Sequence, residues 1–455
     1  MNFSQFDRYS RYFAGAALLI ALLTYWRFRE IELSAVFAYV AQQDVIRSAL
    51  FQSVGSSRSI FWDFFGLINR MIMPHSIEFL RLVGVIIIVI NFVLLYRLIN
   101  YVLGQKFWGF LSVFLAALSP FAVVAAVSGG PAAIGATIAT LFLMALYRNE
   151  YIFGGILAGA AFAANLPGLI MFLIVILDLL QNLEDRNKLV QRLLSAAAGF
   201  FAVALLVFFY SVYSGNSGMF SIPLGDSDLK WAFVGVAPLI VVNVLNFAGV
   251  LYLIVKKRYD VYRTHFHTLM MWITSCALCI VQPSTLNFLF ALTVSSVLGM
   301  FFLQGFASLW RFKLVSPDTF VFVFVMLFLF GDIYANNTFL KDVVLGDSIQ
   351  KSEAIQDVVE SIMPLGGNSM LVSNFAPAEL SVKLGRPVYA VEGQPLPVWN
   401  PMISGFPTIF VTRRRSRVDA PSGNCRALFS TRYIENGQDY FVQVIECREK
   451  KWKTR

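Results

Sequence analysis

Residues 82–100 read LVGVIIIVINFVLLYRLIN, an almost unbroken run of aliphatic and aromatic side chains. A helix of roughly 20 apolar residues spans the hydrocarbon core of a bilayer, which is about 30 Å thick. Similar runs recur along the chain, and soluble domains do not carry them in series. We therefore predict a polytopic α-helical membrane protein with about eleven spanning helices. They lie near 13–26, 82–100, 108–127, 131–147, 152–164, 167–181, 194–213, 232–255, 267–282, 286–306 and 317–335.

The composition agrees with this class. Hydrophobic residues make up 58% of the chain, charged residues make up 14%, and the mean hydropathy is +0.68. These values lie well outside those of soluble domains. The net charge of +9 requires no nucleic-acid partner, because much of it lies in loops that would face anionic lipid headgroups.

Lys and Arg cluster in every second gap between the predicted spans. The short gaps at 128–130, 165–167 and 282–284 contain no basic residue. Loops on the cytoplasmic side of a membrane are enriched in Lys and Arg, so the N-terminus is predicted to be cytoplasmic. An odd number of spans then places the C-terminus outside, and we predict a multi-pass protein of the inner (plasma) membrane. The basic gaps carry Arg97 and Lys106; Arg148; Arg186, Lys188 and Arg192; Lys256, Lys257, Arg258 and Arg263; and Arg311 and Lys313.

Two outer segments are long enough to carry a function. In the loop 27–81, the stretches 34–50 and 60–72 have the spacing of amphipathic helices, and the second is rich in aromatic rings. We expect both to lie on the outer membrane surface as part of a transmembrane domain at 1–335. The tail at 336–455 alternates helical and strand patterns and is predicted to be a small extracytoplasmic α/β domain.

The last two predicted strands, 425–434 and 438–447, form a hairpin. A three-residue loop at 435–437 would place Ile434 opposite Gln438 and Cys425 opposite Cys447. Cross-strand neighbours lie within disulfide reach, so this register predicts a disulfide. A two-residue turn would shift the register by one residue and separate the sulfur atoms. The Cys pair at 276 and 279 lies within a span, where packed or lipid-facing thiols are the simpler interpretation.

The order of parts resembles the GT-C superfamily of membrane glycosyltransferases, especially its protein mannosyltransferase and aminoarabinose transferase branch. The sequence likeness runs over 79–179 and includes LRL at 80–82, LYRL at 95–98, LGQKF at 103–107 and ALSP at 117–120. The resemblance implies a first span, an outer loop with a catalytic acid and two amphipathic helices, many further spans and a small outer domain. It also implies transfer of a sugar from a polyprenyl phosphate without a metal or another cofactor.

Members of that superfamily place an Asp, often Asp-Glu, just after the first span and about two residues before an aromatic residue. Here AVFAY at 35–39 is similar to the stretch that follows, so the acidic pair would fall on Leu33 and Ser34. Glu30 and Glu32 are the nearest carboxylates. A slip of one or two residues would make Glu32 the general base, and otherwise the site lacks its base.

The alternative for Glu30 and Glu32 is pairing with nearby Arg residues or with solvent. Asp44 and Asp63 are further substrate-binding candidates, although each also fits the wet side of an amphipathic helix. The outer turn at 127–131, which often carries a charge in the superfamily, reads VSGGP, so it would offer only backbone N–H groups to a phosphate. A tight turn explains the same residues.

A basic cluster, Arg413, Arg414 and Arg415, lies in the tail. Arg binds phosphate oxygens in a bidentate way, so these residues are candidates for binding a lipid phosphate or an anionic glycan. A solvated strand end accounts for them equally well. The His residues at 75, 265 and 267 form no metal-ligand pattern, and those at 265 and 267 are expected to contact headgroups. Asp178 lies near the end of a span, where water is expected to reach it.

Three functions follow from these observations. The first is a transferase that moves a sugar from a polyprenyl-phosphate donor to an outer lipid, glycan or protein acceptor. The second is a catalytically inactive relative that acts as a membrane subunit and binds a membrane protein partner through its outer loop and tail. The third is a lipid or glycan transporter, which the lack of internal repeats disfavours.

Overall fold

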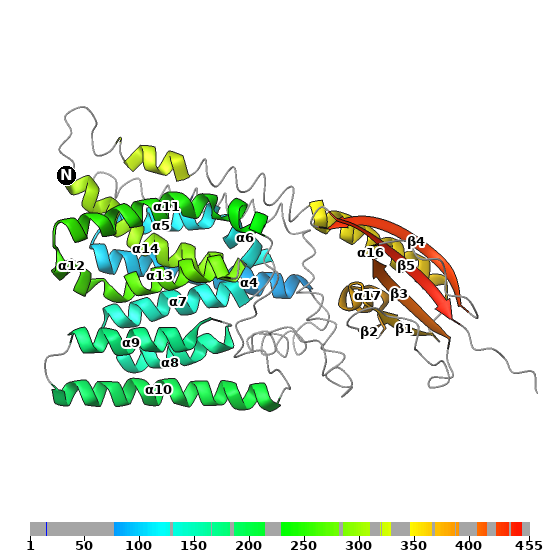
Figure 1. Cartoon of the computed structure of the whole chain (residues 1–455), viewed down its shortest axis with the longest axis horizontal. Coiled ribbons are helices and arrows are strands. Elements are labelled where there is room, and N and C mark those ends of the chain that lie inside the picture. The colour runs from blue at the N-terminus through cyan, green and yellow to red at the C-terminus, as the bar shows by residue number, and fades with distance from the viewer. Residues whose placement is uncertain are drawn as a thin grey trace, which may run out of the picture. The chain divides into compact units, whose positions relative to one another are not determined.

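The computed structural model describes two compact units, a helical unit and an α/β unit (Figure 1). The residues described are 15, 77–127, 131–164, 166–182, 186–213, 229–281, 285–309, 319, 321–328, 346–365, 369–386, 388–390, 407–415, 425–435 and 438–447.

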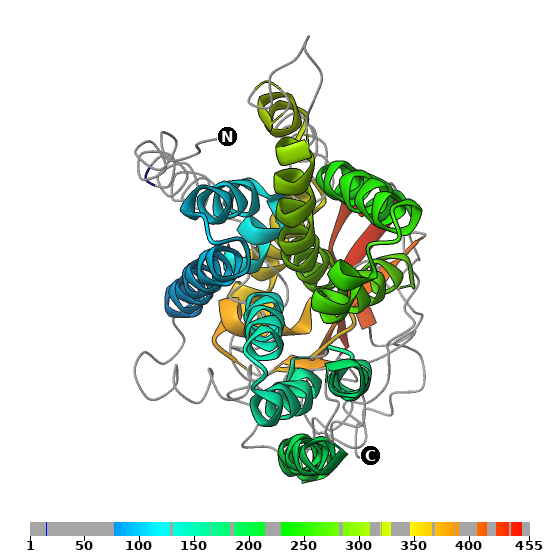
Figure 2. The same ribbon diagram turned by 90° about the vertical axis from the view of Figure 1, so that its left-hand side faces the viewer.

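The helical unit contains long apolar helices that run side by side, and Figure 2 shows them end-on. Each predicted span between 82 and 306 falls on helix. The bounds are α4 (Ile77–Leu103), α5 (Lys106–Leu118), α6 (Pro120–Val127), α7 (Pro131–Tyr147), α8 (Tyr151–Ala163), α9 (Gly168–Asn182), α10 (Arg186–Tyr213), α11 (Leu229–Val255), α12 (Tyr259–Thr264), α13 (Phe266–Val281) and α14 (Thr285–Leu309).

Three helices in the described ranges are long and apolar enough to cross a membrane, within Leu82–Leu103, Asn187–Phe209 and Leu286–Phe306. The other apolar helices are shorter. The predicted span at 13–26 lies outside the described residues except for Gly15, and only part of 317–335 is described. The count of about eleven spans therefore stays a prediction.

Helix α14 forms the centre of the helical unit. It packs against α5, α6, α7, α11 and α13, and 89% of its most apolar window is buried. Helix α10 differs, because Leu205, Leu206 and Phe209 are exposed along it. A helix that is apolar on all sides is either enclosed by other helices or in contact with lipid. We assign the first environment to α14 and the second to α10.

The predicted span at 108–127 is not one helix. Helix α5 ends at Leu118, Ser119 is extended, and α6 starts at Pro120. Proline lacks a backbone N–H and disfavours helical dihedrals in the residue before it, so the helix breaks there. The Ser119 hydroxyl oxygen accepts a hydrogen bond from the Phe121 N–H at 3.3 Å, which satisfies a donor in the first turn of α6.

The short connection between α7 and α8 is a tight turn with one left-handed residue. Asn149 has φ +58°. Its N–H donates to the Leu146 carbonyl at 2.9 Å, and the Glu150 N–H donates to the Ala145 carbonyl at 2.9 Å. This is the hydrogen-bond pattern of a Schellman C-cap, in which Asn is an accepted left-handed residue. Because α8 starts directly after Glu150, the turn rigidly couples the two helices.

The connection between α11 and α12 repeats this geometry with Lys257 at φ +51°. A left-handed conformation costs a residue with a Cβ about 1 kcal/mol or more, whereas glycine adopts it freely. We expect Lys257→Gly to raise stability by up to about 1 kcal/mol. Thermal unfolding in detergent measures this change, with the neighbouring Lys256→Gly as the control. Equal midpoints for the two variants would contradict the assignment.

The α/β unit contains a five-stranded sheet in the order β2-β1-β3-β5-β4. Strand β1 pairs in parallel with β2 and β3, and β5 pairs antiparallel with β3 and β4. The elements are α16 (Gly346–Ile362), the 3₁₀ turn η3 (Met363–Leu365), β1 (Met370–Ser373), α17 (Pro377–Leu384), β2 (Val388–Ala390), β3 (Thr408–Arg414), β4 (Cys425–Glu435) and β5 (Gln438–Cys447).

Helix α16 covers one face of this sheet through an apolar side that contains Ile355, Val358 and Ile362. These side chains form a core with sheet residues that include Ile409 and Val444. The spacing of three and four residues along α16 is the periodicity that predicts a helix. Alternate strand residues, such as Phe410 and Ile445, lie on the opposite face.

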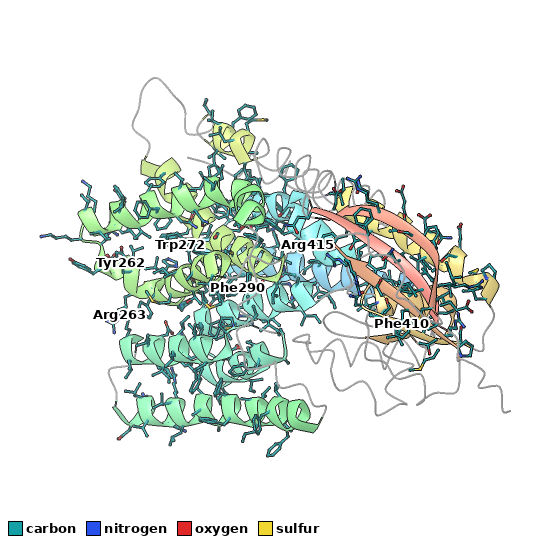
Figure 3. All side chains as sticks on the ribbon, turned by 45° about the vertical axis from the view of Figure 1, so that its right-hand side comes forward. Tyr262, Arg263, Trp272, Phe290, Phe410 and Arg415 are labelled. Atoms are coloured by element: carbon teal, nitrogen blue, oxygen red, sulfur yellow. A yellow bond between two sulfur atoms is a disulfide. The ribbon has the colours of Figure 1, made fainter. Side chains whose placement is uncertain are left out.

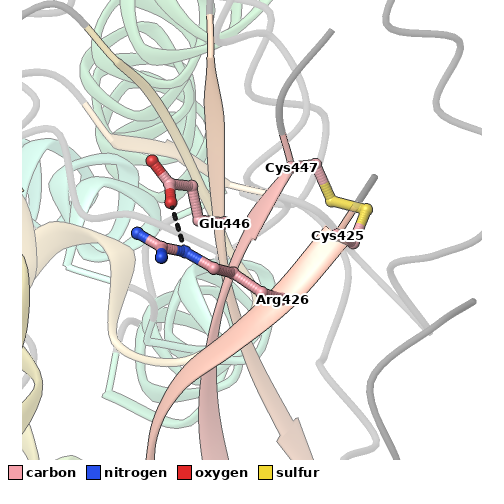
Figure 4. The surroundings of a disulfide bond; sticks show 4 residues. All are labelled: Cys425, Arg426, Glu446 and Cys447. Carbon is pink, nitrogen blue, oxygen red and sulfur yellow. Dashed lines mark hydrogen bonds and ion pairs between the residues drawn. A yellow bond between two sulfur atoms is a disulfide. The ribbon is translucent and has the colours of Figure 1, made fainter. Parts of the chain in front are cut away.

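The predicted three-residue hairpin loop is wrong. Glu435 pairs with Gln438, so only Asn436 and Gly437 lie between the paired residues, a sequence typical of two-residue loops. The shorter loop shifts the pairing of the two strands by one residue. A register shift between Ala427 and Phe429 then shifts the pairing back by one residue. Cys425 is therefore opposite Cys447 after all, and the two sulfur atoms form a disulfide (Figure 4). Beside it, Arg426 Nε donates to Glu446 Oε2 at 2.9 Å.

Candidate functional site

The predicted catalytic carboxylates, Glu30 and Glu32, lie outside the described residues, as do Asp44 and Asp63. Their roles stay predictions. The structure does describe the helices that flank the outer turn, where α6 ends at Val127 and α7 starts at Pro131. Proline is favoured at the first position of a helix, because a backbone N–H at that position would have no acceptor within the helix.

Aromatic and aliphatic side chains hold α6 and α7 against α14. The rings of Phe121 and Phe288 stack with centroids 4.7 Å apart. Gly135 of α7 is so close to Leu286 that a Cβ at this position would collide with that side chain. A nearby buried hydrogen bond, from Thr140 Oγ1 to Asn91 Oδ1 at 2.7 Å, joins α7 to α4. The described parts of these helices therefore supply an apolar, closely packed support for the predicted outer turn.

The three clustered Arg residues do not share one surface. The Arg413 guanidinium lies 3.9 Å from the centroid of the Tyr440 ring and 5.8 Å from that of Tyr433. Arg414 lies on the other face of β3, because successive strand residues alternate. Arg415 directly follows the strand and is exposed (Figure 3). The cation of Arg413 is thus engaged with tyrosines, and Arg415 is the member exposed to solvent.

A buried polar group connects α9 and α13. Asp178 Oδ1 lies 3.1 Å from His267 Nδ1, and the two residues are 1% and 3% exposed. The expectations that water reaches Asp178 and that His267 contacts headgroups are therefore wrong. An acidic residue inside a predicted span is itself a signal for a buried partner, because a lone charge in the membrane is costly.

Tyr147 of α7 completes this buried group. Its hydroxyl lies 2.8 Å from His265 Nδ1 and 2.8 Å from Thr268 Oγ1, and its ring packs edge-on against the His267 ring. Burial lowers the pKa of His265, in the turn before α13, to about 4, so this imidazole is neutral at pH 7. The contacts tie α7, α9 and α13 together.

The same group is not a metal centre. Across the described ranges, no three His, Cys, Asp or Glu side chains are placed to hold a metal ion. Helix α9 is tied to α12 as well, because the Arg263 guanidinium donates to the Gln181 carbonyl in the last turn of α9. A cation favours that end of a helix, where the carbonyls point outward. We interpret the buried group as a connection between helices.

Long apolar helices and a separate small α/β unit are the parts that the sequence resemblance to the GT-C superfamily implies. Comparison with solved structures confirms this resemblance at the level of the fold. The crystal structure of ArnT from Cupriavidus metallidurans in the apo state matches with a TM-score of 0.59 and 12% sequence identity. The match covers 94% of this chain and 97% of the ArnT chain.

The crystal structure of the same ArnT bound to undecaprenyl phosphate matches with a TM-score of 0.56, 12% identity and the same coverage. At this identity the likeness is one of fold. No family model matches the sequence, and no curated protein matches it.

Proposed function

We propose that the protein is a membrane glycosyltransferase that moves a sugar from a polyprenyl-phosphate donor to a lipid, glycan or protein acceptor outside the cytoplasm. The observation that carries this proposal is the extent of the likeness to ArnT, which covers nearly all of both chains. One of the matching ArnT structures is bound to undecaprenyl phosphate. A lipid of that class requires an apolar bundle beside a polar outer site, which is the arrangement predicted from the sequence.

In the proposed reaction, the acceptor nucleophile attacks the anomeric carbon of the sugar. The bond from that carbon to the phosphate oxygen breaks, and the polyprenyl phosphate leaves with the electron pair. Glu32, or Glu30 beside it, accepts the proton that the acceptor loses. Asp44, Asp63 and the exposed Arg415 are proposed to bind the substrates. A carboxylate and hydrogen-bond donors suffice for this chemistry.

The proposed location is the inner membrane, with the N-terminus in the cytoplasm and the α/β unit outside. Two observations support this orientation. Arg148 lies at the α7–α8 turn, and Lys256, Lys257 and Arg258 lie at the α11–α12 turn, as expected of the cytoplasmic ends of spans. The Cys425–Cys447 disulfide suits the oxidising outer side of a membrane.

Transfer by the purified protein in lipid tests the proposal. A labelled undecaprenyl-phosphate sugar is supplied with candidate acceptors, and release of undecaprenyl phosphate is measured. We expect Glu32→Gln to lower the rate by about 10²–10⁴-fold, since general-base catalysis contributes that much. Glu30→Gln is measured in parallel to identify the base, and Glu353→Gln, an exposed position on α16, is the control. Unchanged rates for both Glu30 and Glu32 variants would remove the assigned base.

One observation favours the second candidate, a catalytically inactive membrane subunit. The positions at which the superfamily places its acidic pair are Leu33 and Ser34. Binding of undecaprenyl phosphate without turnover of any donor, together with co-purification of another membrane protein, would support this subunit role. Absence of both binding and turnover would overturn the glycosyltransferase proposal.

A further inference from the structure

A cavity of about 580 Å³ opens between the first turn of α8 and the second and third turns of α10. The two helices run side by side (Figure 1). Small-molecule sites commonly have volumes of roughly 300–1,000 Å³. The cavity lies beside the rigid α7–α8 turn, where Glu150 precedes α8. Its lining residues, at 149–153, 191, 192 and 195, do not belong to the loop 27–81 to which the proposed transfer reaction is assigned.

Two opposite charges line this cavity without pairing with each other. Glu150 contributes a carboxylate, and Arg192 of α10 contributes a guanidinium. Within the part of the chain that the structure describes, neither has an ion-pair partner, and Glu150 makes no side-chain cap for α8. A cavity with one charge of each sign is complementary to a ligand that itself carries a cation and an anion.

The guanidinium is held in place by an aromatic ring. The Arg192 guanidinium carbon lies 5.7 Å from the centroid of the Tyr151 ring. The Tyr151 hydroxyl in turn donates to Asn149 Oδ1 at 2.9 Å, which anchors the ring to the left-handed turn. A cation–π contact leaves the N–H edges of a guanidinium available for an anion. Gln191, beside Arg192 in the cavity wall, offers an amide donor.

The apolar surroundings indicate that the ligand is a lipid. Ile152 and Phe153, in the cavity wall, are 55% and 43% exposed. Leu194 on α10 is 65% exposed. Exposed large apolar side chains next to unpaired charges mark the boundary between hydrocarbon and headgroups. A ligand that fits here has a charged headgroup and an apolar tail.

We infer that this cavity binds a zwitterionic phospholipid with a primary ammonium, of the phosphatidylethanolamine class. Its phosphate oxygens accept hydrogen bonds from Arg192 and Gln191, and its ammonium donates to Glu150. The acyl chains lie along Ile152, Phe153 and the exposed side of α10. Phosphatidylcholine lacks the ammonium N–H donors, and phosphatidylglycerol lacks the cation, so neither satisfies both charges.

Native mass spectrometry of the purified full-length protein tests this inference. The protein is equilibrated with equimolar phosphatidylethanolamine, phosphatidylcholine and phosphatidylglycerol, and the retained lipid is identified. We expect preferential retention of phosphatidylethanolamine. Arg192→Gln is expected to lower its binding by about tenfold or more, because hydrogen bonds to charged groups are lost. Glu150→Gln is expected to lower phosphatidylethanolamine binding to the level of phosphatidylcholine while leaving phosphatidylcholine binding unchanged.

The control is Lys256→Gln, which removes an exposed cation from another turn outside the cavity. Arg192→Lys retains the charge without the planar fork and is expected to bind at an intermediate level, which gives a second variant should Arg192→Gln fail to fold. Equal retention of the three lipids, or Glu150→Gln and Arg192→Gln variants that bind like the control, would overturn the inference. Free phosphoethanolamine that competes as strongly as the lipid would overturn the assignment to a phospholipid. None of these results depends on the proposed transfer reaction.

Discussion

Replacing Gly155 with leucine is expected to leave little or no folded protein. Gly155 lies where α8 crosses α10, and a Cβ at this position would collide with the backbone of Ala196. One turn later, a Cβ at Gly159 would meet the Phe200 carbonyl oxygen at 2.8 Å, and Gly199 of α10 approaches the Ile152 carbonyl in the same way. Backbone cannot rotate away as a side chain can, so the helices would have to separate.

Small residues allow membrane helices to approach closely, and much of their association energy depends on that contact. Overpacking by a single methyl group costs about 1–3 kcal/mol, so Gly155→Ala is expected to be clearly destabilising and Gly155→Leu more so. The measurement is the yield of monodisperse protein after detergent extraction and its thermal unfolding midpoint. Gly305→Ala in α14 is the matched control, because a Cβ there meets nothing within 4 Å. Wild-type behaviour of Gly155→Ala would contradict the close α8–α10 contact.

Replacing His267 with leucine is expected to destabilise the helical unit by about 3–5 kcal/mol. The substitution leaves the Asp178 carboxylate buried without its partner. Removing one member of a buried pair is costly because the remaining charge is neither solvated nor neutralised. Replacing both members by apolar residues of similar size removes that penalty. We therefore expect the double variant His267→Leu with Asp178→Leu to be more stable than His267→Leu alone.

Thermal unfolding of the single and double variants in detergent measures this difference. Asp178→Asn retains a hydrogen-bonding side chain and is expected to lie between wild type and His267→Leu. The control is Asp260→Asn, since Asp260 forms an exposed ion pair with Arg258 and such pairs contribute little. If the double variant is no more stable than His267→Leu, the pair is not the source of the destabilisation.

The positions of most helices in the helical unit were predictable from the sequence alone. A span needs a run of apolar residues of sufficient length, and that property is local. The basic and non-basic gaps, the helix of α16 and the strands of the β4–β5 hairpin were likewise evident from composition and periodicity. The break at Ser119 was missed, although Pro120 signals it, because hydropathy averaged over a window is insensitive to a missing N–H.

The catalytic roles of Glu30 and Glu32 are predicted only through the resemblance to the GT-C superfamily. The clustered Arg residues show why neighbours in sequence are a poor guide to a binding surface. Arg413 and Arg414 are adjacent in the chain, yet the pleat of β3 sends them to opposite faces. The disulfide between Cys425 and Cys447 depends on a bulge near Ala427 that compensates for a short loop, and no loop sequence specifies such a bulge.

The sequence by itself determined that this protein is an apolar helical bundle with a small α/β unit, because hydrophobic periodicity and length act within each segment. Only the tertiary structure decided which distant residues meet. Asp178 contacts His267, which lies 89 positions further along the chain. Glu150 and Arg192 line the same cavity because α8 packs on α10. Such contacts depend on how helices pack, and packing is set by the shapes of several segments at once rather than by the pattern within any one of them.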